Sequence, residues 1–170
     1  MLKRALALTL SLLLLCAAAL GETTRYGEVF DAQGDAGRLT VRFLWLGPQV
    51  AEDKPGDAMI LTSPDGKVMV LDAGHPQAAE YVTAALDALG VTRIDYLVAS
   101  PPHIDHIGVF PTLLSRYEVG AIYTSALTYE ASAYYQAFLA AMADKGLSPI
   151  LLQEGDSFSF GEEVTVEVFN

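Results

Sequence analysis

Tyr-Leu-Val-Ala-Ser-Pro-Pro-His-Ile-Asp-His-Ile-Gly, residues 96–108, is the stretch that says most about this chain. Its first residues are apolar and rich in strand formers, which predicts a buried strand that ends at Ala99. His103, Asp105 and His106 follow in a loop at the carboxyl end of that strand. In open α/β folds such loops face the ligand-binding crevice, so these side chains are candidates for chemistry rather than packing.

The residue types in this loop indicate a metal site. Imidazole nitrogens and a carboxylate suit zinc foremost, with manganese or iron as alternatives. We therefore predict a divalent metal bound by His103, Asp105 and His106, with Asp105 also orienting an attacking water and so acting as the catalytic residue. The alternative is a loop whose polar groups bond only to one another and to the backbone.

Strands and helices are expected to alternate on both sides of this loop. Pro64-Asp65-Gly66 is a turn signal between two strands, and Pro76 and Gly90 fit the beginning and the end of a helix. Paired strands alternating with helices predict an α/β (α+β) fold with a mixed sheet. The predicted strands are 39–46, 58–62, 67–71, 96–99, 120–123, 157–160 and 164–169, and the predicted helices are 76–89, 110–117 and a longer one over 134–146.

The chain begins like a secreted protein. Lys3 and Arg4 precede an apolar run that ends in small residues, which predicts a signal peptide over 1–21. Residues 22–38 are then a tether or irregular lead-in, and 39–170 form the domain. A retained membrane anchor is the alternative to cleavage; after cleavage no membrane span is expected. The expected location is secreted or associated with the cell envelope.

Charge and cysteine content exclude some classes of partner and of metal ligand. The formal charge of −11 disfavours nucleic-acid backbones and anionic lipid as partners. Cys16 is the only cysteine and falls within the predicted signal peptide, so the mature domain has no thiolate ligand. Nitrogen and oxygen must hold any metal.

Four segments in a fixed order resemble one protein family. They are Gly56-Asp57-Ala58-Met59-Ile60, Pro64-Asp65-Gly66-Lys67, Val70-Leu71-Asp72-Ala73-Gly74, and Ile94-Asp95-Tyr96-Leu97-Val98 leading into the histidine loop. Their succession resembles the metallo-β-lactamase fold, and most of all the branch that contains the soluble domain of ComEC-type DNA-uptake proteins. The resemblance covers about residues 39 to 169.

The resemblance implies an αββα sandwich with one or two divalent metals between its sheets and a metal-activated water that attacks a phosphodiester, ester or amide. The family loop reads His-x-His-x-Asp-His: its first two histidines hold one metal, and the Asp and the last His hold the other. His103 matches the second histidine, and Asp105 and His106 match the last pair. Pro101 stands where the first histidine is expected, and proline has no side chain that binds a metal.

Two further residues are placed near the site by the same resemblance. Asp72 occupies the family's Asp-x-Gly position, where the acid shapes the cleft without binding metal. His75 follows that glycine and could supply the nitrogen that Pro101 removes; the alternative is a solvent-facing histidine beside a helix start. The family's later ligands, an Asp after Thr-Gly and a late His, would lie beyond Asn170, so we expect a fold that is truncated and incomplete at the carboxyl end.

The expected function is metal-dependent hydrolysis, with phosphodiesters as the substrate class that the resemblance suggests. Nucleic acid is a partner by resemblance, although the acidic charge disfavours it. The alternatives are a catalytically impaired fragment and a non-enzymatic binding module with the same fold.

Overall fold

The computed structural model describes residues 29–48, 54 and 56–169; the predicted signal peptide and residues 22–28 of the lead-in lie outside them. In this part of the chain six strands form one sheet in the order β1-β2-β3-β4-β5-β6, and β7 and β8 form a second, two-stranded sheet. The strands are β1 (Thr40–Phe43), β2 (Ala58–Thr62), β3 (Val68–Ala73), β4 (Arg93–Ala99), β5 (Glu118–Ser125), β6 (Pro149–Leu152), β7 (Ser157–Phe160) and β8 (Val164–Glu167). The first three strands are antiparallel and β3 to β6 are parallel, which confirms the predicted mixed sheet.

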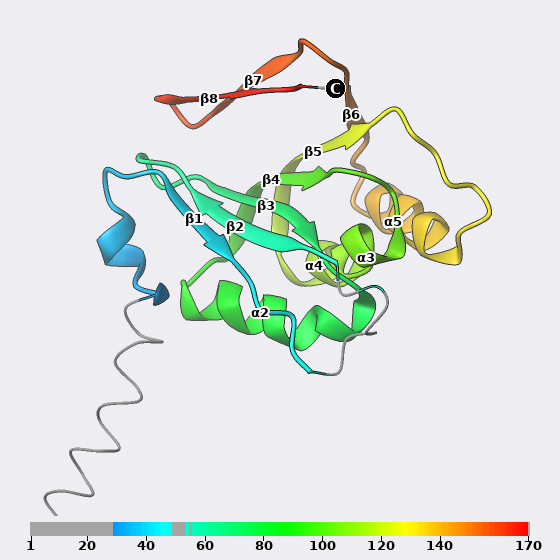
Figure 1. The fold of residues 1–170 in the computed structure, drawn as a ribbon, viewed down its shortest axis with the longest axis horizontal. Helices are drawn as coiled ribbons and strands as arrows, with labels where there is room; N and C mark the ends of the chain where they lie inside the picture. Colours follow the sequence, from blue (N-terminus) through cyan, green and yellow to red (C-terminus); the bar gives the residue numbers. More distant parts are fainter. Residues whose placement is uncertain (1–28, 49–53, 55, 170) are drawn as a thin grey trace, which may run out of the picture.

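The helices lie on one face of the six-stranded sheet, and the β7–β8 hairpin lies on the other (Figure 1). The helices are the 3₁₀ helices η1 (Ala32–Asp35) and η2 (Pro76–Ala78) and the α-helices α2 (Ala79–Ala88), α3 (Ile104–Ile107), α4 (Phe110–Arg116) and α5 (Ala133–Asp144). The predicted helices after Pro76, at 110–117 and at 134–146 are confirmed. No helix among the described residues is long and apolar enough to cross a bilayer.

One row of side chains crosses the sheet and faces the helices. Ile60, Val70, Leu97 and Ile122 are register partners in turn, and each is at most 1% exposed. Arg42 of β1 ends this row opposite Ile60 and is buried against Asp35, with 2.7 Å between Nη2 and Oδ1. The alternating apolar residues of β1 therefore face outward: Phe43 is 78% exposed.

Aromatic rings join the hairpin to the sheet. The ring of Phe158 stacks on Tyr123 with centroids 4.2 Å apart, and Phe160 meets Tyr96 edge-on at 5.5 Å. Burial, together with the nearby Tyr96, raises the pKa of Tyr123. These ring contacts hold β7 and β8 against the sheet face that carries Tyr96 and Tyr123.

Several strand ends are shifted, most of all in β1, which spans Thr40–Phe43 and not 39–46, and two elements were not predicted at all. The histidine loop contains one helical turn, α3, because the amides of His106 and Ile107 bond back to the carbonyl of His103. Strand β6 was not predicted, since Pro149 and a short apolar run carry no alternation; it forms by parallel pairing with β5.

Candidate functional site

The site is built around Asp72, at the carboxyl end of β3. Consecutive β2 residues Ala58 and Met59 pair with Ala73 and Leu71, so Asp72 is skipped in the register, as in a β-bulge. Its φ is +53°, a left-handed conformation that Asp tolerates better than most residues. The side chain is thereby directed away from the regular strand pattern, and the residue is 3% exposed.

Ser100, which follows β4, holds the Asp72 carboxylate. The Ser100 amide donates to Asp72 Oδ1 at 2.9 Å, and the Ser100 hydroxyl donates to Oδ2 at 2.5 Å. Because β3 and β4 are adjacent and parallel, their carboxyl ends meet and this contact closes between them. In the sequence, Ser100 is simply the residue after a predicted strand, and that position does not indicate that it binds Asp72.

His106 lies on α3 and completes this group. Its Nδ1 is 2.9 Å from Asp72 Oδ2. An ionised carboxylate only accepts hydrogen bonds, so the neutral imidazole carries its proton on Nδ1 and presents a bare lone pair at Nε2. Asp72, which we predicted to lie near the site, contacts His106 itself, and its structural role there stays a prediction.

Asp105 lies beside the free nitrogen of His106. Its Oδ2 is 3.7 Å from His106 Nε2, and both side chains are partly exposed, at 23% and 19%. Two ligands of one tetrahedral zinc, with bonds of about 2.1 Å, are roughly 3.4 Å apart, so this pair nearly has the spacing of two ligands of one ion.

Two glycines allow α3 to pack closely against the neighbouring loops. A Cβ on Gly108 would lie 2.3 Å from Cδ of Pro76, and a Cβ on Gly56 would lie 1.8 Å from the carbonyl oxygen of Asp105. Gly56 also has a φ of +72°, which favours glycine. Only the hydrogen of glycine fits at these two positions, and α3 is thereby fixed between the loops.

His103 is not part of this group. It is the exposed N-cap residue of α3, and its ring meets Tyr129 edge-on with centroids 5.5 Å apart. Within residues 29–48, 54 and 56–169 no three His, Cys, Asp or Glu side chains are grouped as a metal site requires. The structure thus brings Asp105 and His106 together with Asp72 and leaves His103 apart, and the predicted ligand role of these residues stays a prediction.

His75 caps the helix start that follows β3. Its Nδ1 accepts a hydrogen bond from the amide of Gln77 at 3.3 Å, and Pro76 begins η2 directly after it. Of the two alternatives for His75, a metal ligand or a histidine beside a helix start, this position is that of the second. In the described part of the chain it does not join two other metal donors.

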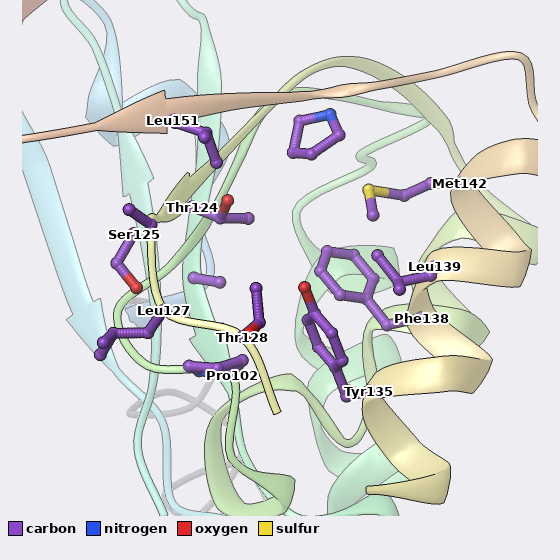
Figure 2. Close-up of a pocket in the computed structure, with 13 residues that line it drawn as sticks. Pro102, Thr124, Ser125, Leu127, Thr128, Tyr135, Phe138, Leu139, Met142 and Leu151 are labelled. Carbon is purple, nitrogen blue, oxygen red and sulfur yellow. The ribbon is translucent and has the colours of Figure 1, made fainter. Parts of the chain in front are cut away.

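An apolar pocket of about 80 Å³ lies between the ends of β4 and β5 and helix α5. Figure 2 shows Tyr135, Phe138, Leu139 and Met142 of α5 on one side and Thr124, Ser125 and Leu151 on the other, with Pro102 below. Pro102 is the only contribution of the histidine stretch 100–108 to this lining. Asp105 and His106 do not line it, so the pocket is separate from their paired side chains.

Comparisons with known proteins support one family. The family model of the metallo-beta-lactamase superfamily matches residues 51–169. A solved putative metallo-beta-lactamase from Thermotoga maritima has a TM-score of 0.51 at 12% identity, over 71% of this chain and 62% of that one. A metallo-beta-lactamase mutant from Cronobacter sakazakii has a TM-score of 0.43 at 22% identity, over 64% of this chain.

The chain spans 45% of the Cronobacter protein, less than half its length. A comparison with curated proteins gives no significant match. These matches concern the superfamily, and the ComEC-type branch and the expected truncation stay predictions. The family model covers well over half of the chain, so the chain belongs to the metallo-beta-lactamase superfamily.

Proposed function

We propose that this protein is a metal-dependent hydrolase in which Asp105 and His106 bind one divalent metal ion, with zinc as the first candidate. Members of the superfamily generally bind divalent metals, and the fold is that of its hydrolases. The observation that carries the proposal is the contact between Asp72 and Nδ1 of His106, at 2.9 Å, which leaves Nε2 bare beside the Asp105 carboxylate.

The described residues fit such an ion in part. A histidine whose other nitrogen is bonded to a carboxylate is the usual orientation of a metal ligand in proteins. Catalytic zinc commonly has three protein ligands, and the described residues bring two together. The family pattern assigns His103 to the neighbouring metal.

Each residue then has a distinct task. Asp72 holds the proton of His106 on Nδ1 and fixes the orientation of the ring, and Ser100 fixes Asp72 through two hydrogen bonds. Asp105 supplies a carboxylate that can also accept a proton from water. A divalent metal, when bound, supplies Lewis-acid activation of water and of the substrate. The phosphodiester substrate class is proposed from the resemblance to the ComEC-type branch.

Metal binding by the whole chain tests this proposal. We expect the protein to retain zinc, manganese or iron after mild dialysis, and we expect His106→Ala and Asp105→Ala each to weaken binding by about tenfold or more. His75→Ala is the matched control, because it removes an imidazole on a neighbouring loop, and it should leave affinity unchanged. Retention of less than about a tenth of an equivalent of each metal would refute the proposal.

A binding module without catalytic turnover is the second candidate, since the described residues do not group three metal donors. Hydrolysis of a chromogenic phosphodiester by the metal-loaded protein separates the two. A rate that His106→Ala and Asp105→Ala abolish supports the enzyme. Metal retention with a hydrolysis rate equal to that of the two variants supports the binding module.

We also propose, from the sequence of residues 1–21, a secreted or envelope-associated location. Fractionation of the producing cells, with the amino terminus of the mature protein determined by mass spectrometry, tests this. Cleavage after Gly21 is the expected result, and an intact amino terminus would contradict it.

A further inference from the structure

A second cavity, of about 370 Å³, borders His103 and the beginning of α3. It is lined by Lys54, His103, Ile104, Tyr129, Ser132, Ala133 and Tyr134. The polar groups in this lining, which we call the Lys54 pocket, are an ammonium, an imidazole and three hydroxyls. Every one of these side chains can donate a hydrogen bond.

The charge of this pocket differs from that of the chain as a whole. The chain carries 21 acidic residues and 10 basic ones, yet no carboxylate belongs to the described lining. The basic side chains of Arg42, Lys67, Arg93 and Arg116 are all in ion pairs with carboxylates. Lys54 forms no ion pair with any residue that the structure describes, so its charge is available to a ligand.

The neighbouring groups are held in place around that ammonium. The edge-on contact with Tyr129 fixes the ring of His103 at the pocket. Ser132 uses its oxygen to accept from the amide of Tyr135 at 3.3 Å, and this contact leaves its hydroxyl proton to donate. Tyr129 and Tyr134 are 49% and 44% exposed, so their hydroxyls are accessible from solvent.

We propose that the Lys54 pocket binds a phosphate group of the substrate. A single ammonium with several separate hydroxyl donors suits a tetrahedral oxyanion that accepts from many directions, whereas a planar carboxylate is matched best by the fork of an arginine. His103 and Ile104 line the pocket and directly precede Asp105 and His106. A phosphate held there would contact the two residues that precede the proposed metal ligands in the sequence, and in this respect the inference rests on the proposed function.

Titration of the metal-free full chain with inorganic phosphate, at constant ionic strength, tests the pocket without relying on activity. NMR signals of the His103 and Tyr129 rings report where the ion binds. We expect Lys54→Gln to weaken phosphate binding by about fivefold or more, since it removes a charge-assisted bond. Lys145→Gln is the matched control, an exposed lysine next to α5 and outside the pocket, and it should leave binding unchanged. Tyr129→Phe, which removes only a hydroxyl, should weaken binding less than Lys54→Gln does.

Equal losses of phosphate affinity in Lys54→Gln and Lys145→Gln would overturn the inference, because phosphate would then be attracted by positive charge anywhere on the surface and not by this pocket. Binding of acetate as tight as that of phosphate would overturn it too. The outcome is independent of the metal: a protein that binds phosphate through Lys54 but retains no metal refutes the proposed function alone, and one that retains metal without binding phosphate refutes this inference alone.

Discussion

Replacing Asp72 with asparagine tests how the site is held together. Asparagine keeps the shape of the side chain and tolerates the left-handed backbone at φ +53°, so the strand end should remain in place. The carboxylate accepts hydrogen bonds from the Ser100 amide, the Ser100 hydroxyl and Nδ1 of His106. A side-chain amide has one oxygen, and its nitrogen must face one of these partners.

The groups that donate hydrogen bonds to residue 72 determine which way the introduced asparagine amide turns. The Ser100 amide can only donate, so the oxygen of the introduced asparagine should stay with it and the new NH₂ group should face His106. His106 must then accept at Nδ1, and its proton moves to Nε2, the nitrogen that we propose as a metal ligand. Loss of such an orienting partner typically weakens metal binding about 10- to 100-fold, or roughly 1.4 to 2.8 kcal/mol.

Two measurements check this prediction. Competition with a fluorescent zinc chelator gives the affinity, and long-range ¹⁵N–¹H NMR of the metal-free protein identifies the tautomer of His106. Asp87→Asn is a suitable control, because it changes a partly exposed carboxylate that bonds Tyr117 and Arg116 and none of the site residues. If Asp72→Asn keeps the Nδ1-protonated tautomer and the zinc affinity of the parent, the orienting role of Asp72 is wrong.

Three further predictions concern packing and charge. Gly56→Ala would place a Cβ 1.8 Å from the Asp105 carbonyl, so zinc binding should weaken in the same competition assay while Gly66→Ala, with nothing within 4 Å of its Cβ, leaves it unchanged. Phe110→Ala removes a ring that is fully buried against Phe138 and should lower the free energy of unfolding in urea by about 3–5 kcal/mol; a loss below about 1 kcal/mol would contradict this packing. Arg42→Met leaves Asp35 buried without its partner and should cost about 3–5 kcal/mol at neutral pH.

The pH dependence of stability gives an independent check on the Asp35–Arg42 pair. Burial raises the pKa of Asp35, but hydrogen bonds from Arg42 and Thr40 and the charge of Arg42 outweigh it, and the net pKa lies below its ordinary value of 3.8. A depressed pKa in the folded state contributes stability that is present above the ordinary value and is lost as the pH falls through the folded-state value. Urea unfolding at a series of acidic pH values should show this loss in the parent protein and not in Arg42→Met; parallel curves would contradict it.

The sequence predicted most elements because local signals and apolar periodicity agree there. Strand β2 lies at the predicted bounds, and Pro76 and Gly90 bracket the helical segment as expected. The prediction was weakest where pairing with a neighbour decides. β6 forms only against β5, and in β1 it is Arg42 rather than the apolar residues that faces the helices.

For the candidate site, the sequence alone determined which side chains could do chemistry and on which strand end they lie, since residue type and position after a strand are local properties. Only the tertiary structure decided their partners. The bulge at Asp72 and the parallel pairing of β3 with β4 bring Asp72, Ser100 and His106 together across 28 and 34 positions of the chain. The ring of His103 packs against Tyr129, which follows β5. Such contacts depend on where distant segments pack, and no spacing within the histidine loop itself encodes them.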